Sequence, residues 1–151
     1  MTTILCPTRG GKESHPNQDF AINLAKARGA DLLFMYVSNI QLIGRSARPI
    51  VVDIEEELDE LGDFLLSMAQ ERAEKSGVPA KVAVRRGNFS KVLREVIVEN
   101  KITTVVLGSS RKETGIVTYE HLQELSRELS GELGVEFIVV QDGTIVFQTV
   151  T

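Results

Sequence analysis

Two runs of small and basic residues in this sequence follow apolar stretches, and their chemistry suits the binding of an anion. The first run follows residues 2–6 and reads Pro-Thr-Arg-Gly-Gly-Lys over residues 7–12. The second follows residues 103–107 and reads Gly-Ser-Ser-Arg-Lys over residues 108–112. In α/β folds, a glycine-rich turn between a buried strand and a helix presents backbone amides to phosphate or carboxylate groups. The two runs therefore predict one ligand crevice at the carboxyl ends of two strands.

The candidate binding residues come from both runs and from the end of a third apolar stretch at 31–37. They are Pro7, Thr8, Arg9, Gly10, Gly11, Val37, Gly108, Ser109, Ser110 and Arg111. The two arginines, with the lysines at 12 and 112, could hold a small anion by side-chain charge. The alternative is that these cations are solvated loop charges, paired with Glu13 or Glu113.

The sequence shows no catalytic or metal-binding constellation. His15 and His121 are its only histidines, and no spacing of cysteine, histidine and acidic residues suggests zinc. We expect His15 at the start of a helix and His121 on the surface. Ser109 and Ser110 have no identifiable base nearby, so a nucleophilic role is not predicted.

The periods of the apolar residues predict the elements that carry these loops. Strands are expected near residues 2–6, 31–38, 79–86, 102–108 and 135–141, with four helices between them. The near-continuous apolar run of the second strand is typical of a parallel strand covered on both faces, and the alternation in the third indicates an edge. The pattern predicts an α/β protein with an open parallel five-stranded sheet and helices on both faces.

The second helix is expected to be long and amphipathic. We expect Asp53 to cap it, after an irregular segment at 40–52, and Gly77 to end it. The acidic residues at 55–60 would then lie in its first turns, where the helix dipole favours them. The side chains expected on its inward face are those of Ile54, Leu58, Leu61, Leu65, Met68 and Ala69; Met35 and Met68 are both expected in core stripes.

The carboxyl-terminal segment departs from the βα alternation. Asp142-Gly143 is a strong hairpin signal, because this pair supplies the positive φ angles that a type I′ turn requires. Residues 144–150 would then form a sixth strand, either antiparallel to the fifth or paired with another chain.

Composition narrows the classes of function. A chain of 151 residues is expected to form one domain over 1–151, with 144–151 as an additional strand. The net charge of −4 argues against a nucleic-acid or anionic-membrane binder. The single cysteine, Cys6, is expected to be a reduced core residue. No signal region or apolar run of about 18 residues is seen, so we expect a cytosolic protein.

Four motifs in order resemble a universal stress protein domain over nearly all of residues 2–141. The first strand opens into Pro-Thr-x-Gly at 7–10, and the first helix ends in Ala-Lys-Ala-Arg-Gly-Ala-Asp-Leu at 25–32. Arg-Gly-Asn-Phe at 86–89 matches the family's short turn before the third helix, and Val-Val-Leu-Gly-Ser at 105–109 matches its fourth strand. The resemblance implies the strand order 3-2-1-4-5 and a crevice between strands one and four. It also implies a homodimer, which we place in the region of the carboxyl-terminal strand.

The ATP signature of the family is altered in this chain. ATP-binding members have an aspartate where Arg9 stands and a second glycine where Arg111 stands. The last Gly-Ser/Thr pair of that signature falls on His121 and Leu122. Glycines there let backbone amides approach phosphate oxygens, and a branched cationic side chain blocks this approach.

Three functions remain open from the sequence. The first is a non-catalytic regulatory protein of the stress response, with no cofactor and a degenerate crevice that holds a small anion. The second is an ATP- or AMP-binding switch of the same fold. The third is an ATP pyrophosphatase of the PP-loop type, since residues 9–14 resemble its Ser-Gly-Gly-x-Asp-Ser loop. However, Arg9 and Glu13 depart from that pattern, and no room remains for a substrate domain.

Overall fold

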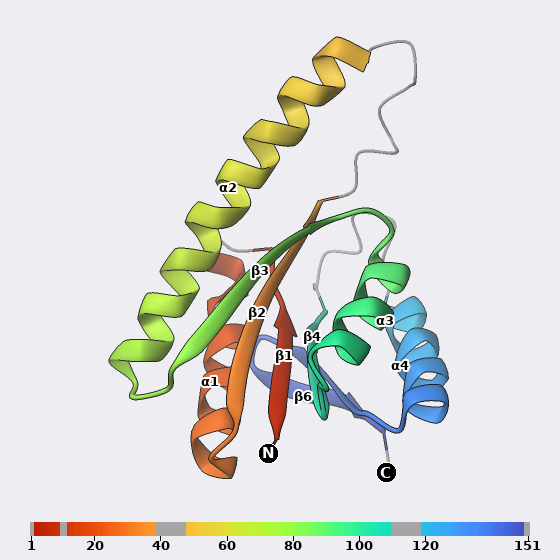
Figure 1. The fold of residues 1–151 in the computed structure, drawn as a ribbon. Helices are drawn as coiled ribbons and strands as arrows, with labels where there is room; N and C mark the ends of the chain where they lie inside the picture. Colours follow the sequence, from red (N-terminus) through yellow and green to blue (C-terminus); the bar gives the residue numbers. More distant parts are fainter. Residues whose placement is uncertain (1, 10–11, 39–47, 110–118, 150–151) are drawn as a thin grey trace.

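A six-stranded sheet lies between two pairs of helices in the computed structural model, which describes residues 2–9, 12–38, 48–109 and 119–149 (Figure 1). The strands are β1 (Thr3–Pro7), β2 (Asp31–Ser38), β3 (Ala80–Arg86), β4 (Thr104–Gly108), β5 (Glu136–Gln141) and β6 (Thr144–Gln148). The helices are α1 (His15–Arg28), α2 (Arg48–Lys75), α3 (Phe89–Glu99) and α4 (Tyr119–Leu133), and a short 3-10 turn, η1 (Lys12–Ser14), precedes α1. The predicted strands agree with these bounds to within about two residues, which is the usual error of such predictions.

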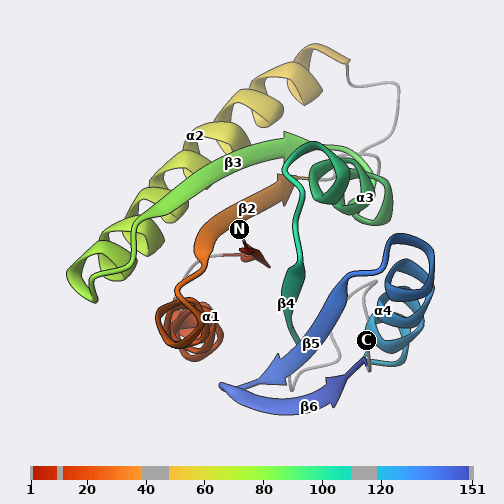
Figure 2. The same cartoon turned by 60° about the horizontal axis from the view of Figure 1, so that its bottom comes forward.

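The strand order is β3-β2-β1-β4-β5-β6. The first five strands are parallel, and β6 runs antiparallel to β5. The helices α1 and α2 cover one face of the sheet, and α3 and α4 cover the other (Figure 2). This confirms the predicted α/β fold, including β3 at an edge.

The strand side chains alternate between two apolar cores. In β1, Ile4 and Cys6 pack in the core beneath α1 and α2, whereas Leu5 packs beneath α3 and α4. Cys6 is fully buried, and burial raises the pKa of its thiol to about 12. The thiol is therefore protonated at neutral pH, and the prediction that Cys6 is a core residue is confirmed.

The helix α2 begins earlier than predicted. It starts at Arg48, so Asp53 lies inside the helix and does not cap it, and residues 48–52 are helical rather than irregular. Pro49 suits this start, because proline lacks the N–H that a first helical turn leaves unpaired. The acidic run at 55–60 consequently lies beyond the first turn. The rest of the predicted irregular segment, residues 40–47, lies outside the described residues.

The inward face of α2 also differs from the prediction. Leu66, Ala69 and Ala73 are buried against the sheet, while Leu61 and Met68 are 46% and 43% exposed. Small residues allow this close packing: a Cβ on Gly62 would lie 2.7 Å from Cδ1 of Tyr36. Ala69 was therefore predicted correctly, and Leu61 and Met68 were not. Leu65 is half-buried, and the side chains of Ile54 and Leu58 lie outside the described part.

The carboxyl-terminal hairpin forms as predicted. Asp142 and Gly143 have φ angles of 52° and 80°, as a type I′ turn requires. Of the two alternatives for the sixth strand, the structure shows the first: β6 pairs with β5 of its own chain. Phe147 packs against the core beneath α4, and the Arg127 guanidinium lies 5.2 Å from its ring centroid.

Candidate functional site

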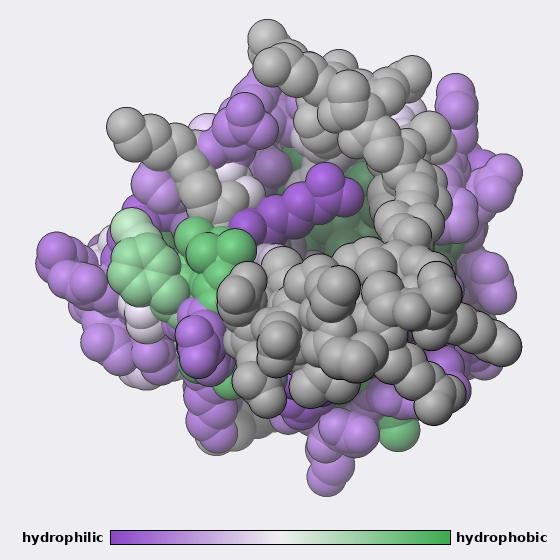
Figure 3. Space-filling view, turned by 90° about the horizontal axis from the view of Figure 1, so that it is seen from above, coloured by the Kyte–Doolittle hydropathy of each residue, from purple (hydrophilic) through white to green (hydrophobic). Residues whose placement is uncertain are grey.

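The strands β1 and β4 part toward their carboxyl ends. Their ladder pairs only Ile4 with Thr104 and Leu5 with Val105. By contrast, the ladder between β1 and β2 continues to Pro7, and that between β4 and β5 continues to Gly108. The chain connections reverse direction at this point, which is where open α/β sheets bind ligands. Figure 3, which looks onto this edge, shows apolar (green) residues lying deeper in the molecule, with a hydrophilic (purple) side chain beside them.

Of the candidate residues that the structure describes, some lie on one face of the sheet beside this opening and some on the other. Strand alternation places Pro7 and Ser109 on the side of α3 and α4, where Val37 packs, and Thr8 and Gly108 on the side of α1. Arg9 follows on the rim and is exposed. The other candidates lie outside the described residues: Gly10, Gly11, Ser110 and Arg111, with Lys112, Glu113 and the side chain of Lys12.

The backbone amides nearest the opening donate within the sheet. The amide of Thr8 donates to the carbonyl of Met35 at 2.8 Å, and that of Ser109 donates to the carbonyl of Val140 at 2.8 Å. Neither amide is available to a phosphate oxygen. An anion at this opening would therefore depend on side-chain charge, such as that of Arg9, or on amides further along the two loops.

A partly buried chain of polar contacts links α2 and α1 to Thr8, the residue after β1. Arg72 of α2 donates to Oε1 of Gln18 at 2.7 Å, and Nε2 of Gln18 donates to Oγ1 of Thr8 at 2.9 Å. Arg72 also forms an ion pair with Asp19. Gln18 is only 2% exposed. We did not predict Gln18 as a site residue, although the sequence holds a signal: a polar residue in phase with the buried stripe of Ala21, Ile22 and Ala25.

The first turn of α1 connects the end of β4 to the hairpin turn. Oδ1 of Asn17 accepts from the amide of Gly143 at 3.0 Å. On the other side, a Cβ on Gly108 would lie 2.7 Å from Nδ2 of Asn17, so any side chain at 108 would displace this amide. The hairpin turn therefore lies beside the α1 side of the opening.

The histidines lie where the sequence predicted. His15 is the first residue of α1, and His121 is exposed on α4. Over the described ranges, no three His, Cys, Asp or Glu side chains are grouped as a metal would need. In the same ranges, no helix has the length and apolar character of a membrane span.

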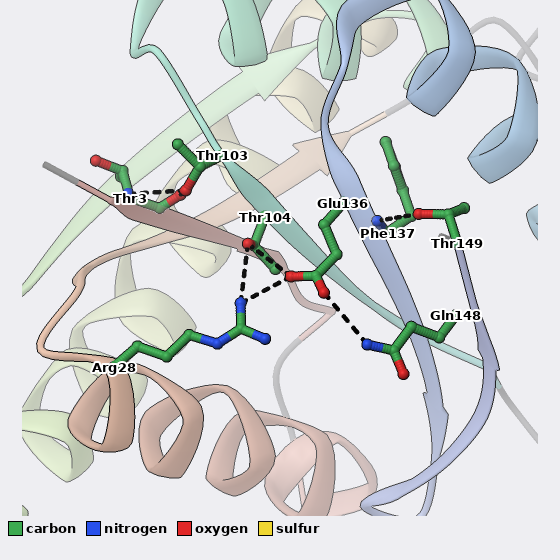
Figure 4. A network of polar contacts seen from close by, with 8 residues as sticks. All are labelled: Thr3, Arg28, Thr103, Thr104, Glu136, Phe137, Gln148 and Thr149. Atoms are coloured by element: carbon green, nitrogen blue, oxygen red, sulfur yellow. Dashed lines mark hydrogen bonds and ion pairs between the residues drawn. The ribbon is translucent and has the colours of Figure 1, made fainter. Parts of the chain in front are cut away.

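A second polar cluster lies at the amino edge of the sheet, opposite the opening (Figure 4). Oε1 of Glu136 accepts from Arg28 at 2.7 Å and from Thr104 at 3.0 Å. Its Oε2 accepts from Gln148 of β6 at 3.2 Å. The hydrogen bond from Arg28 lowers the pKa of the Glu136 carboxyl below its ordinary value of 4.5; burial opposes this, and Thr104 and Gln148 assist it. The cluster joins α1, β4, β5 and β6.

Replacing Glu136 with Gln is expected to destabilise the protein at pH 7 and to have a smaller effect at pH 3. The folded pKa lies below the unfolded one, so the ionised carboxyl stabilises fully above about pH 4.5, and this stability is lost as pH falls through the folded pKa. The loss at pH 7 should be about 1 kcal/mol, since Arg28 is 38% exposed and water screens the pair. Urea unfolding at both pH values measures it, with the exposed Glu95→Gln as control. Equal destabilisation at both pH values would contradict the assignment.

The model of the universal stress protein family matches residues 1–128 of the chain. The chain belongs to the universal stress protein family. No curated protein matched the chain in a sequence search.

Solved structures of universal stress proteins share this fold. UspA from Lactobacillus plantarum superposes with a TM-score of 0.74 at 15% identity, over 92% of this chain and 97% of that one. A universal stress protein in complex with cAMP gives 0.60 at 19% identity, over 93% and 97%. One from Archaeoglobus fulgidus in complex with dAMP gives 0.58 at 13% identity, over 92% and 96%. At these identities the likeness shows the fold alone.

Proposed function

We propose that this protein is a non-catalytic, cytosolic regulator of the stress response, whose crevice holds a small anion rather than ATP. The observation that carries the proposal is the exposed Arg9 on the rim of the opening between β1 and β4. A cation at this position attracts phosphate, sulfate or a small carboxylate. Family membership supports the regulatory class, and the hydrogen bond from the buried Gln18 to the half-buried Thr8 supports a preformed rim.

The arrangement disfavours a triphosphate lying along the loops. The amides of Thr8 and Ser109 donate to neighbouring strands, so they offer nothing to phosphate oxygens. Arg111 stands where a glycine would permit close approach. We therefore expect binding to be driven by side-chain charge, which suits a compact anion better than an extended nucleotide.

Calorimetric titration tests the proposal. We expect an ATP Kd no better than roughly 0.1 mM, about −5.5 kcal/mol. Inorganic phosphate should bind more tightly than ATP. The Arg9→Gln substitution should weaken the binding of phosphate. Micromolar ATP binding by the unmodified protein would overturn the proposal and favour a nucleotide switch.

An ATP- or AMP-binding switch is the second candidate. Universal stress proteins of this fold have been solved in complex with cAMP and with dAMP, and those ligands carry one phosphate rather than three. A nucleoside monophosphate needs fewer amides than ATP. Titration with AMP, dAMP and cAMP distinguishes the candidates: a monophosphate that binds at least tenfold more tightly than phosphate would support the switch.

We also propose a homodimer through the carboxyl-terminal strand region. β6 is the last strand in the sheet order, and Ile145 and Val146 on it are exposed. An outer strand with apolar side chains is a surface on which another chain can pair. Ile145→Lys should then halve the mass measured by light scattering, and an unchanged mass would reject this contact.

A further inference from the structure

The outward face of α2 carries an apolar stripe on the described part of the helix. Leu61, Phe64 and Met68 are 46%, 61% and 43% exposed, and Leu65 beside them is half-buried. These residues form a second apolar face, separate from the buried one of Leu66, Ala69 and Ala73. We call Leu61, Phe64, Leu65 and Met68 the α2 stripe. In Figure 3 an apolar (green) area lies on the side where α2 runs.

The spacing of the α2 stripe is that of a helix–helix contact. Leu61, Phe64 and Met68 are separated by three and then four residues, as apolar positions are along the seam of a coiled coil. Leaving large apolar side chains exposed to water is unfavourable, because burying apolar surface lowers the free energy of the protein. The amino-terminal part of α2 also extends past the sheet (Figure 1), so a second helix can approach without meeting the sheet.

The positions of the four α2 stripe residues allow the stripe to pack against the same stripe of a second copy. Positions 61, 64, 65 and 68 are symmetric about the point between 64 and 65. A two-fold axis through this point maps Leu61 onto Met68 and Phe64 onto Leu65. A two-fold contact requires such self-complementarity, because residue i meets residue j and j meets i.

The charges of α2 select the antiparallel arrangement. Every charged residue from position 53 to 63 is acidic. Apart from Arg48, the basic residues of the helix are Arg72 and Lys75, both in its last turn. Parallel helices would set one acidic half against the other, which is repulsive. Antiparallel helices set the acidic half against residues 71–75, where Arg72 and Lys75 balance Glu71 and Glu74, so the repulsion is smaller than between two acidic halves.

We propose that two copies of this protein associate through the α2 stripe, with the helices antiparallel. This contact lies over β2 and β3, at the end of the sheet remote from β6. It is therefore separate from the contact proposed at the carboxyl-terminal strand, and each can be removed without the other.

Substitution at the centre of the stripe tests the association. Phe64→Ser should halve the mass measured by light scattering and, at a dilution where both proteins are monomeric, leave the unfolding midpoint unchanged, because the side chain is exposed in the single copy. The matched control is Val98→Ser, since Val98 is 62% exposed on α3 and lies outside the stripe. An unchanged mass with a lowered midpoint would show that the chain covers the stripe itself. If neither the mass nor the midpoint changed, a partner of another kind would be indicated. Either result would overturn the proposal.

Disulfide trapping tests the orientation. Leu61→Cys and Met68→Cys are made separately, and the buried Cys6 does not interfere. Antiparallel helices bring position 61 of one copy beside position 68 of the other, so only the mixture should crosslink on oxidation. Parallel helices would separate these positions by seven residues, about 10 Å, and would crosslink each variant with itself. That second outcome, or no crosslink at all, would overturn the antiparallel contact.

Discussion

Deleting residues 144–151 is expected to destabilise the protein by at least about 3 kcal/mol and to cause aggregation. The deletion removes β6 from the ladder that runs from Ile138 to Gln141, together with Phe147, which packs beneath α4. It also removes the hydroxyl of Thr149, which accepts from the amide of Phe137 at 2.9 Å. The outer edge of β5 would then be unpaired and flanked by apolar side chains, and such edges pair with other chains. Urea unfolding and light scattering measure the two effects.

Two comparisons make the deletion informative. Removing only 150–151 leaves the β5–β6 ladder intact and should leave stability and mass unchanged. Val98→Ser changes an exposed side chain on α3, away from β6, and should leave the free energy of unfolding within about 0.5 kcal/mol of its original value. If the larger deletion gave a stable protein of unchanged mass, β6 would be irrelevant to both stability and assembly.

Replacing Arg9 with Asp and Arg111 with Gly together is expected to strengthen ATP binding at least tenfold, which is about 1.4 kcal/mol. The first change restores the acid that ATP-binding family members carry after the Pro-Thr pair, and the second restores a glycine that permits close backbone approach. Phosphate binding should weaken in the same variant, because Arg9 no longer attracts the anion. Calorimetry with ATP and with phosphate measures these opposite changes.

The control for charge is Lys101→Asp. Lys101 precedes β4 at the amino edge of the sheet, far from the opening, and its φ of 51° suits aspartate. The variant reproduces the charge change of Arg9→Asp and should leave ATP and phosphate affinity unchanged. An equal gain in ATP affinity would show that net charge, rather than the site, governs binding. No gain in the double variant would reject the account of the altered signature.

Most of the strands and helices, and the family resemblance, could be predicted from the amino-acid sequence, although α2 begins earlier than predicted. The strands, the hairpin at Asp142-Gly143 and the burial of Cys6 were predicted correctly, because apolar period and turn chemistry depend on residues close together in the chain. The strand order followed from the resemblance to the family. The candidate crevice residues remain a prediction, which rests on the rule that loops after parallel strands share one edge of a sheet.

The faces that these helices and strands bury depend on contacts that form only when the chain folds. A stripe of large residues on α2 predicted that Leu61 and Met68 are buried, but Gly62, Ala69 and Ala73 permit closer packing on Tyr36, so small residues face the sheet. Gln18 forms hydrogen bonds with Arg72 and Thr8, which lie 54 and 10 residues away from it along the chain. The parting of β1 from β4 likewise depends on contacts between distant segments, which no local pattern encodes.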